Sequence, residues 1–415
     1  MTPRKPTRAT ARKSTRKSTR KSTTKATGKS PSTTTRKRTR TATSGRGAGA
    51  SSAAGSVVAQ LEAIERNGGT GDVSLGRGVK LHVSSLGKVY FPDAGVTKGA
   101  LMRYYAQVAP VLLPQLDGRP LVLKRYPEGI AGEMFFQQDA GPHVPEVVRV
   151  QALDTEEKGK RMRIIGGDLA TLLYTVQLGA IEVHPWLSRV TDIDSPDRCL
   201  IDLDPDDEVP FPSVVALAGD ILRIVEECGL RAAVKTSGST GMHVVLPLPP
   251  RTTYETSVRL ASRIAELTVK LRPTVATVER SIHGRPAGSI YVDAMQNARG
   301  KSAASAYSVR ARKGATVSAP VEPGELTGRL RMSAFTVRTM PARIARVGDI
   351  WGSSLKGRPT TRALTRALQM LEDALDAPAN DAEAPRVRKR GKAGGRDAGP
   401  GDARRPRGRA HATRE

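Results

Sequence analysis

Apolar and polar residues follow helical and strand periods in the middle of the chain. Residues 97–116 place apolar side chains at helical spacing behind a cap residue, Thr97, which predicts a core helix. Residues 198–204 (RCLIDLD) predict a strand, and residues 212–228 predict an amphipathic helix that ends before Gly229. Strand and helix therefore follow one another directly here.

The same alternation continues toward residue 293. Apolar runs at 232–236, 242–248 and 289–293 predict three more strands, and residues 253–271 predict another helix. A glycine-rich turn separates the first two of these strands. This order predicts an α/β or α+β sheet with helices against one face.

Composition narrows the class of protein. The 415 residues include enough apolar side chains for a sizeable core. The two cysteines, Cys199 and Cys228, exclude a disulfide framework and a Cys-rich zinc module. No run of about 18 apolar residues and no apolar N-terminal stretch is present. We expect a cytoplasmic protein without a membrane segment.

The formal charge of +27 lies almost entirely in the two ends of the chain. Residues 1–55 carry 16 Lys/Arg and no acid, with three copies of Arg-Lys-Ser-Thr at 12–23, and residues 386–415 carry 11 Lys/Arg against 3 acids. Only +3 remains for residues 56–385. Such ends cannot bury enough apolar surface to fold, so we expect disordered tails that bind DNA phosphates. Solubilising extensions are the alternative.

Asp202 and Asp204 end the predicted strand at 198–204. Side chains two apart in a strand share a face, so the two carboxylates project together. Their repulsion raises each pKa unless a cation neutralises them, and oxygen ligands favour Mg²⁺ or Mn²⁺. The alternative is that Asp-Pro-Asp-Asp at 204–207 only ends a strand and caps the next helix.

Two further groups of residues suit a nucleotide triphosphate. Ser237 to His243 (SGSTGMH) join two predicted strands, and glycines there allow backbone N–H groups to face an anion. An ordinary hairpin turn is the alternative. Asp293 ends another strand and is followed by Gln296, Asn297, Arg299 and Lys301, a setting that suits a two-metal site on a triphosphate. Surface ion pairing is the competing explanation.

Together these segments resemble the polymerase domain of bacterial ATP-dependent DNA ligase D, which belongs to the archaeo-eukaryotic primase superfamily and works in non-homologous end joining. The resemblance implies an α+β primase-polymerase fold, with an RRM-like antiparallel sheet flanked by helices, and template-dependent gap filling at DNA breaks. It rests on these stretches, in order along the chain: 85–92 (SLGKVYFP), 121–127 (LVLKRYP), 133–138 (EMFFQQ), 178–189 (LGAIEVHPWLSR), 201–205 (IDLDP), 235–246 (KTSGSTGMHVVL), 292–310 and 335–343 (FTVRTMPAR).

The resemblance also implies roles for individual residues. Asp202, Asp204 and Asp293 match the family's ligands for two Mn²⁺ or Mg²⁺ ions. Contacts to the incoming NTP or dNTP fall on Lys124, His184, Ser237, Gly238, His243, Gln296 and Arg310. Lys88 and Lys98 match the family's pocket for a DNA 5′-phosphate, and Phe135 or Phe136 matches the aromatic residue that stacks on a template base. Alternatively, the two lysines are solvated surface charges and one phenylalanine packs in the core.

Domain organisation follows from these expectations. We expect a disordered arm at 1–55, a primase-polymerase catalytic domain at 56–360, a helical, acidic linker at 361–385 and a disordered Arg-rich tail at 386–415. Neither a ligase adenylation motif nor a His-rich phosphoesterase segment occurs in the sequence. The resemblance therefore implies a stand-alone, nucleoid-associated form that binds gapped or broken duplex DNA with a 5′-phosphate, with Ku and a separate DNA ligase as candidate partners that the sequence does not test.

One departure and two alternatives remain. Thr240 stands in the glycine turn where many relatives have Lys or Arg, so one phosphate contact is missing. A non-catalytic DNA-end-binding or nucleoid protein on a primase-like scaffold is one alternative. A primer-synthesising primase, which would share the same site, is the other. No residue in the sequence sets the preference for ribonucleotides or deoxyribonucleotides.

Overall fold

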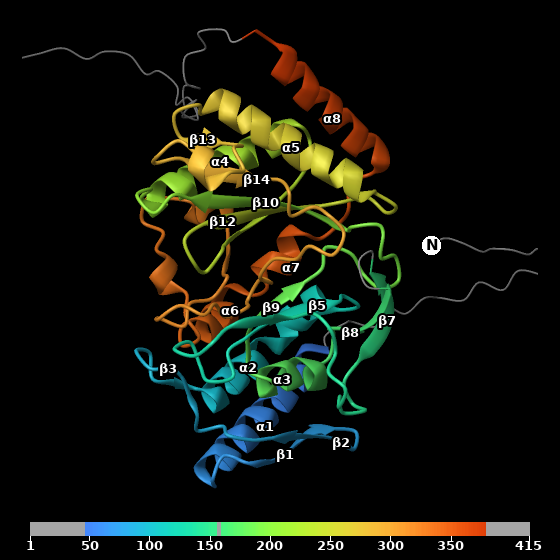
Figure 1. The fold of residues 1–415 in the computed structure, drawn as a ribbon, viewed down its shortest axis with the longest axis vertical. Helices are drawn as coiled ribbons and strands as arrows, with labels where there is room; N and C mark the ends of the chain where they lie inside the picture. The colour runs from blue at the N-terminus through green and yellow to red at the C-terminus, as the bar shows by residue number, and fades with distance from the viewer. Residues whose placement is uncertain (1–45, 156–158, 379–415) are drawn as a thin grey trace, which may run out of the picture. The chain divides into compact units, whose positions relative to one another are not determined.

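Six strands form the large sheet of the computed structural model, which describes residues 46–155 and 159–378 (Figure 1). Their order is β13-β14-β10-β12-β11-β15, and every neighbouring pair is antiparallel except β13 and β14. The strands are β10 (Arg198–Pro205), β11 (Ala233–Thr236), β12 (Met242–Pro247), β13 (Ala276–Thr277), β14 (Ile290–Asp293) and β15 (Pro320–Val321). β10 and β12 lie at the centre of the sheet, and most of their residues are buried.

Helices α4 (Phe211–Glu227) and α5 (Tyr254–Leu271) pack on this sheet (Figure 1). Each presents an apolar stripe at helical spacing, as the sequence predicts. The hydroxyl of Thr253 caps α5 by accepting from the Thr256 amide at 3.1 Å. Gly229 follows α4 with φ 73°, a conformation that glycine adopts without strain.

A smaller sheet lies beneath the large one in Figure 1, with the order β6-β5-β9. Its strands are β5 (Leu121–Arg125), β6 (Phe135–Gln137) and β9 (Ala180–Pro185). Helices α2 (Lys98–Leu116) and α3 (Leu169–Gln177) lie on its far side. Thr97 caps α2 as predicted, since its hydroxyl accepts from the Ala100 amide at 3.0 Å.

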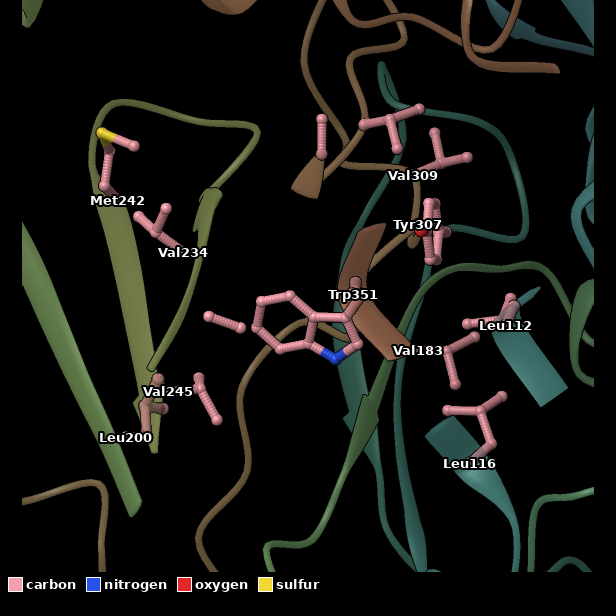
Figure 2. Packing of buried hydrophobic residues seen from close by; sticks show 14 of the residues in the cluster. Leu112, Leu116, Val183, Leu200, Val234, Met242, Val245, Tyr307, Val309 and Trp351 are labelled. Carbon is pink, nitrogen blue, oxygen red and sulfur yellow. The ribbon is translucent and has the colours of Figure 1, made fainter. Parts of the chain in front are cut away.

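The space between the two sheets is filled by Trp351 and by the segment 302–319. Trp351 of α7 (Ile350–Ser354) lies between Val234 and Val245 of the large sheet and Val183 of β9 (Figure 2). The Ser305 amide donates to the Val183 carbonyl at 3.0 Å, and the Thr236 amide donates to the Ala319 carbonyl at 2.9 Å. One hydrophobic core therefore joins the sheets and holds the facing strands at a set distance.

The remaining elements surround these layers. They are α1 (Arg46–Arg66), β1 (Gly71–Gly76), β2 (Val79–Val83), β3 (Val89–Phe91), β4 (Val96–Thr97), β7 (Val150–Thr155), β8 (Gly159–Ile164), the 3₁₀ turns Ile282–Gly284, Pro323–Glu325 and Met332–Ala334, α6 (Met340–Val347) and α8 (Thr361–Asp376). Among the residues described, no helix is both long and apolar enough to cross a membrane.

The predicted α+β class is confirmed, and so are the predicted helices and strands between residues 97 and 293. The segment 361–385, expected as a helical, acidic linker, begins with helix α8, and Leu364, Leu368 and Leu371 bury the apolar side of that helix against the domain. Helix α1 begins at Arg46, inside the range expected as an arm. Residues 1–45 and 379–415 lie outside the described chain.

Candidate active site

Three of the predicted site residues lie side by side on β10 and its two neighbours. Asp202 is the register partner of Asp293 on β14 and of His243 on β12. Directly opposed residues in antiparallel strands share a face, so their side chains are adjacent. Nε2 of His243 lies 3.3 Å from Oδ1 of Asp202. Asp204, two positions further along β10, belongs to the same face.

Asp202 occupies an electrostatically unfavourable position. Its side chain is 28% exposed. Burial, followed by the charges of Asp204 and Asp293, raises its pKa from 3.8 to about 7. The positive charges of Lys235 and Arg310 oppose this increase without cancelling it. A cation at this place would relieve both the repulsion and the cost of burial.

Asp204 and Asp293 each have other partners. Oδ2 of Asp204 accepts from Arg285 Nη1 at 3.2 Å. Asp293 accepts from the Tyr291 hydroxyl at 3.2 Å and from Gln296 Nε2 at 2.9 Å. In the described residues, no three His, Cys, Asp or Glu side chains are already gathered into a metal site. Three carboxylates on one face still offer the oxygen donors that Mg²⁺ and Mn²⁺ prefer, once these hydrogen bonds are exchanged.

The glycine-rich turn closes on its own serine. The Ser237 amide donates to the Gly241 carbonyl at 2.9 Å, and the Ser237 hydroxyl accepts from the amides of Ser239 and Gly241 at 3.1 and 3.0 Å. These two amides are therefore engaged, and the anion cradle expected from the sequence is not formed by them. The Ser237 hydroxyl retains one proton to donate.

Two glycines of the turn are required by space. Gly238 has φ 73°, and a Cβ there would lie 2.6 Å from Cγ of Arg310. A Cβ on Gly241 would overlap the carbonyl oxygen of Leu203. Backbone of the turn therefore packs directly on β10 and on Arg310. Thr240, the departure from the family pattern, is exposed at the tip.

His243 is oriented by a buried lysine. Nζ of Lys235, the register partner of His243 on β11, lies 2.7 Å from His243 Nδ1. The same ammonium donates to the Ser318 hydroxyl at 2.7 Å and to the Ala304 carbonyl at 3.0 Å. If Nδ1 accepts from Lys235, the imidazole proton is on Nε2 and faces Asp202. Burial lowers the pKa of both Lys235 and His243.

A cluster of basic residues on the small sheet is gathered around Glu182 of β9. Oε2 of Glu182 accepts from His184 Nε2 and from Arg310 Nε, both at 2.9 Å. Oε1 accepts from the Ala311 amide at 3.1 Å and lies 3.5 Å from Lys124 Nζ. Burial would raise the pKa of Glu182, but the His184 hydrogen bond and the Arg310 and Lys124 charges hold it well below its usual range. Burial lowers the pKa of His184, although its hydrogen bond to Glu182 opposes this shift.

Arg310 connects this cluster to the large sheet. Its Nη1 donates to the carbonyl of Ser237, in the glycine turn, while its Nε is held by Glu182. Lys124, His184 and Arg310 are thus brought together, and Arg310 joins them to Ser237 beside His243. The structure thus brings Lys124, His184, Ser237, His243 and Arg310 into one connected group, whereas the predicted contact Gln296 hydrogen-bonds Asp293 instead.

Both candidate stacking residues lie on the surface of β6. Phe135 and Phe136 are 44% and 56% exposed, so neither packs in the core. The guanidinium of Arg125 lies 4.8 Å from the Phe135 ring centre, and Lys124 Nζ lies 5.9 Å from that of Phe136. Phe136 also meets His184 edge-to-face at 6.4 Å. Phe136 therefore borders the basic cluster with a face open to solvent.

Lys88 and Lys98 form a separate pair at the two ends of the β3–β4 hairpin, where Lys88 precedes β3 and Lys98 begins α2. The Lys98 amide donates to the Lys88 carbonyl at 2.8 Å, and Lys88 Nζ lies 2.5 Å from Glu128 Oε1. Lys98 Nζ donates to the Ser84 carbonyl at 3.0 Å and is nearly buried. Burial, followed by the Lys88 charge, lowers the pKa of Lys98 to about 8. Lys98 is therefore not the solvated surface charge of the alternative interpretation.

Sequence reasoning missed two residues of this site, Glu182 and Lys235. Both lie inside stretches that carry the family resemblance, but neither was singled out. A charged residue inside an apolar strand was the available signal, because such a residue is rarely buried without a partner. Their partners could not be named without the strand register.

The chain is similar to known proteins along this same region. The family model for the LigD primase-polymerase domain matches residues 97–351. The multifunctional non-homologous end joining protein LigD of Pseudomonas aeruginosa is 33% identical over 278 residues, 66% of this chain and 33% of that protein. The bifunctional non-homologous end joining protein LigD of Bacillus subtilis is 32% identical over 270 residues, 65% of this chain and 43% of that protein.

A solved structure agrees. The polymerase domain from Mycobacterium tuberculosis ligase D, in complex with DNA, matches with a TM-score of 0.62 and 29% identity, over 67% of this chain and 99% of that one. The chain spans less than half the length of the curated relatives it matches. The matched region contains the two sheets, the aspartates and the basic cluster described above. The chain therefore belongs to the LigD primase-polymerase family.

Proposed function

We propose that this chain is a metal-dependent nucleotidyltransferase that extends primer 3′ ends and fills gaps at DNA double-strand breaks in non-homologous end joining. The observation that supports the proposal most is the strand register that sets Asp202 between Asp293 and His243. The names of the relatives and the DNA-bound structural neighbour support the pathway and the substrate.

Asp202, Asp204 and Asp293 are the residues that would hold Mg²⁺ or Mn²⁺. The raised pKa of Asp202 and the all-oxygen donor set fit a hard divalent ion. Bound there, two such ions would supply Lewis-acid chemistry to the primer 3′-hydroxyl and to the leaving pyrophosphate. Arg285 donates to Asp204, and Gln296 donates to Asp293. Both hydrogen bonds would break when an ion binds to these carboxylates.

The basic cluster would bind the triphosphate. Lys124 and Arg310 carry positive charge, and the hydroxyl of Ser237 is a further donor. His243 presents Nε2–H beside Asp202, where a phosphate oxygen would lie. These donors are fixed by buried partners before any nucleotide arrives, so little reorganisation is needed on binding.

The DNA would be held on either side of this centre. Phe136 offers an exposed ring on which a template base of any identity can stack. Lys88 and Lys98, which are joined by a backbone hydrogen bond, offer two basic side chains suited to a terminal 5′-phosphate. Ku and a separate DNA ligase, as partners at nucleoid DNA, belong to the same proposal, because the relatives act in end joining.

Primer extension on a gapped duplex with a 5′-phosphate tests the proposal. NTPs and dNTPs are each supplied with Mg²⁺ or Mn²⁺ to the wild type, to Asp202→Ala and to Asp207→Ala. Asp207 is an exposed carboxylate of the same stretch and serves as the matched control. We expect metal-dependent extension by the wild type and the control, and none by Asp202→Ala.

Other outcomes separate the rival functions. Tight DNA binding without incorporation under either ion would favour a non-catalytic end-binding protein. Synthesis on a template without any primer would favour a primase. Substantial extension by Asp202→Ala would contradict the metal assignment.

A further inference from the structure

Within the residues that the structure describes, Glu182 is the most buried of the carboxylates that form ion pairs. Its side chain is 2% exposed, and its two oxygens face four donors from three separate chain segments. A carboxylate with four donors has used its full acceptor capacity. It therefore has no oxygen left to bind a ligand, and any function must act through its neighbours.

Arg310 and His184, two of the residues that contact Glu182, each have a nitrogen that makes no hydrogen bond within the described residues. Arg310 uses Nε on Glu182 and Nη1 on the Ser237 carbonyl, and its Nη2 has no hydrogen-bond partner within 46–155 and 159–378. His184 uses Nε2 and likewise leaves Nδ1 without one among the described residues. Glu182 thus determines where the unused nitrogens of two predicted nucleotide contacts point.

The charge of Glu182 and its effect on the orientation of Arg310 should change nucleotide affinity in opposite directions. A carboxylate beside a triphosphate repels it, so removing the charge should strengthen nucleotide binding if orientation did not matter. If orientation matters, Arg310 without its anchor would follow Ser237 or turn to solvent, and binding should weaken. The two explanations predict changes of opposite sign.

We infer that Glu182 is a positioning residue of the nucleotide site, which holds Arg310 between β9 and the glycine turn so that its guanidinium meets the triphosphate. The inference rests on the proposed function. Glu182 is the register partner of Lys124 on β5, so its carboxylate also lies beside a third predicted nucleotide contact.

Nucleotide binding without turnover gives the first test. The affinity of a non-hydrolysable α,β-methylene triphosphate with Mg²⁺ is measured by calorimetry for the wild type, Glu182→Gln and Glu372→Gln. Glu372 pairs with Arg259 on the far helices and is the matched control. We expect about tenfold weaker binding for Glu182→Gln, the loss of about one charge-assisted hydrogen bond, and no change for the control. Unchanged or tighter binding by Glu182→Gln overturns the inference.

A double-mutant cycle tests whether the effect passes through Arg310. Arg310→Ala alone should weaken binding, and adding Glu182→Gln to it should cost little more, because the anchored group is already gone. Fully additive losses would show that Glu182 acts independently of Arg310 and would overturn the inference.

A second variant covers the case in which Glu182→Gln does not fold. Glu182→Asp keeps the charge but withdraws the carboxylate by one methylene. Weaker nucleotide binding at an unchanged melting temperature supports positioning, and wild-type affinity contradicts it. If the wild type neither binds the triphosphate nor extends primers, the proposed function fails. If the wild type does both and the Glu182 variants bind equally well, only the positioning role fails.

Discussion

Replacing Asp202 with asparagine should make the metal-free protein more stable while abolishing its activity. Asparagine keeps an oxygen for His243 Nε2 and removes the charge that burial, Asp204 and Asp293 disfavour. A pKa raised from 3.8 to about 7 corresponds to about 4 kcal/mol of unfavourable free energy in the charged folded state. Since the side chain is 28% exposed, solvent reduces this, and we expect about 2 kcal/mol.

The sign of the pH dependence follows from proton binding. Between about pH 4 and pH 7 the folded wild type keeps a proton on Asp202 that the unfolded chain has lost, so its stability falls as the pH rises through this window. The variant has no such proton. The stability difference between the two proteins should be near zero at pH 4 and reach its full value near pH 8.

Urea unfolding in EDTA at pH 4.5, 6 and 8 measures this difference, because other titrating groups cancel between wild type and variant. Asp207→Asn, at an exposed position, should show no pH-dependent difference. Added Mg²⁺ should stabilise the wild type more than Asp202→Asn, since only the wild type retains the full ligand set. A difference that is flat with pH, or a variant less stable at pH 8, would refute the reasoning.

Three further outcomes are expected. Leu371→Ala in α8 should lower the free energy of unfolding, measured in urea, by about 2–5 kcal/mol, because Leu371 is buried. The control Leu271→Ala, at a half-exposed position, should change it by less than about 0.5 kcal/mol. Equally small effects of both substitutions would show that α8 does not pack on the domain. Phe136→Ala should weaken binding to single-stranded overhangs by about 1–3 kcal/mol in fluorescence anisotropy and leave blunt duplex binding unchanged; equal losses on both would exclude stacking. Deleting residues 1–45 should flatten the dependence of DNA affinity on salt, and an unchanged slope would show that they make no phosphate contacts.

Local signals in the sequence predicted the elements that carry the site. The cap at Thr97, the helical period of α4 and α5 and the apolar strands around β10 all depend on neighbours a few residues apart. The same reasoning placed Asp202 and Asp204 on one face of a strand, since alternation is a property of the strand itself. Motif resemblance then supplied the candidate roles and the family.

Which residues meet across the fold was a different matter. Asp202 faces Asp293 and His243 only because β10 lies between β14 and β12 in one particular register, and a shift by one residue would turn every side chain to the other face. The four donors of Glu182 come from two strands and a distant loop, and Lys235 reaches His243 across a strand pair. The sequence of α8 shows an amphipathic segment but not its packing partner, and only the structure shows that α5 covers its apolar side.

The sequence by itself therefore determined helices α2, α4 and α5, strands β10, β11, β12 and β14, the carboxylate pair on β10 and the family, because these depend on local periodicity and on recognisable motifs. The tertiary structure alone decided that the glycine turn closes on Ser237, that Phe135 and Phe136 are both exposed, and that Glu182 anchors Arg310. The physical reason is that strand order and register are set by the packing of the whole core, which no short stretch of sequence contains.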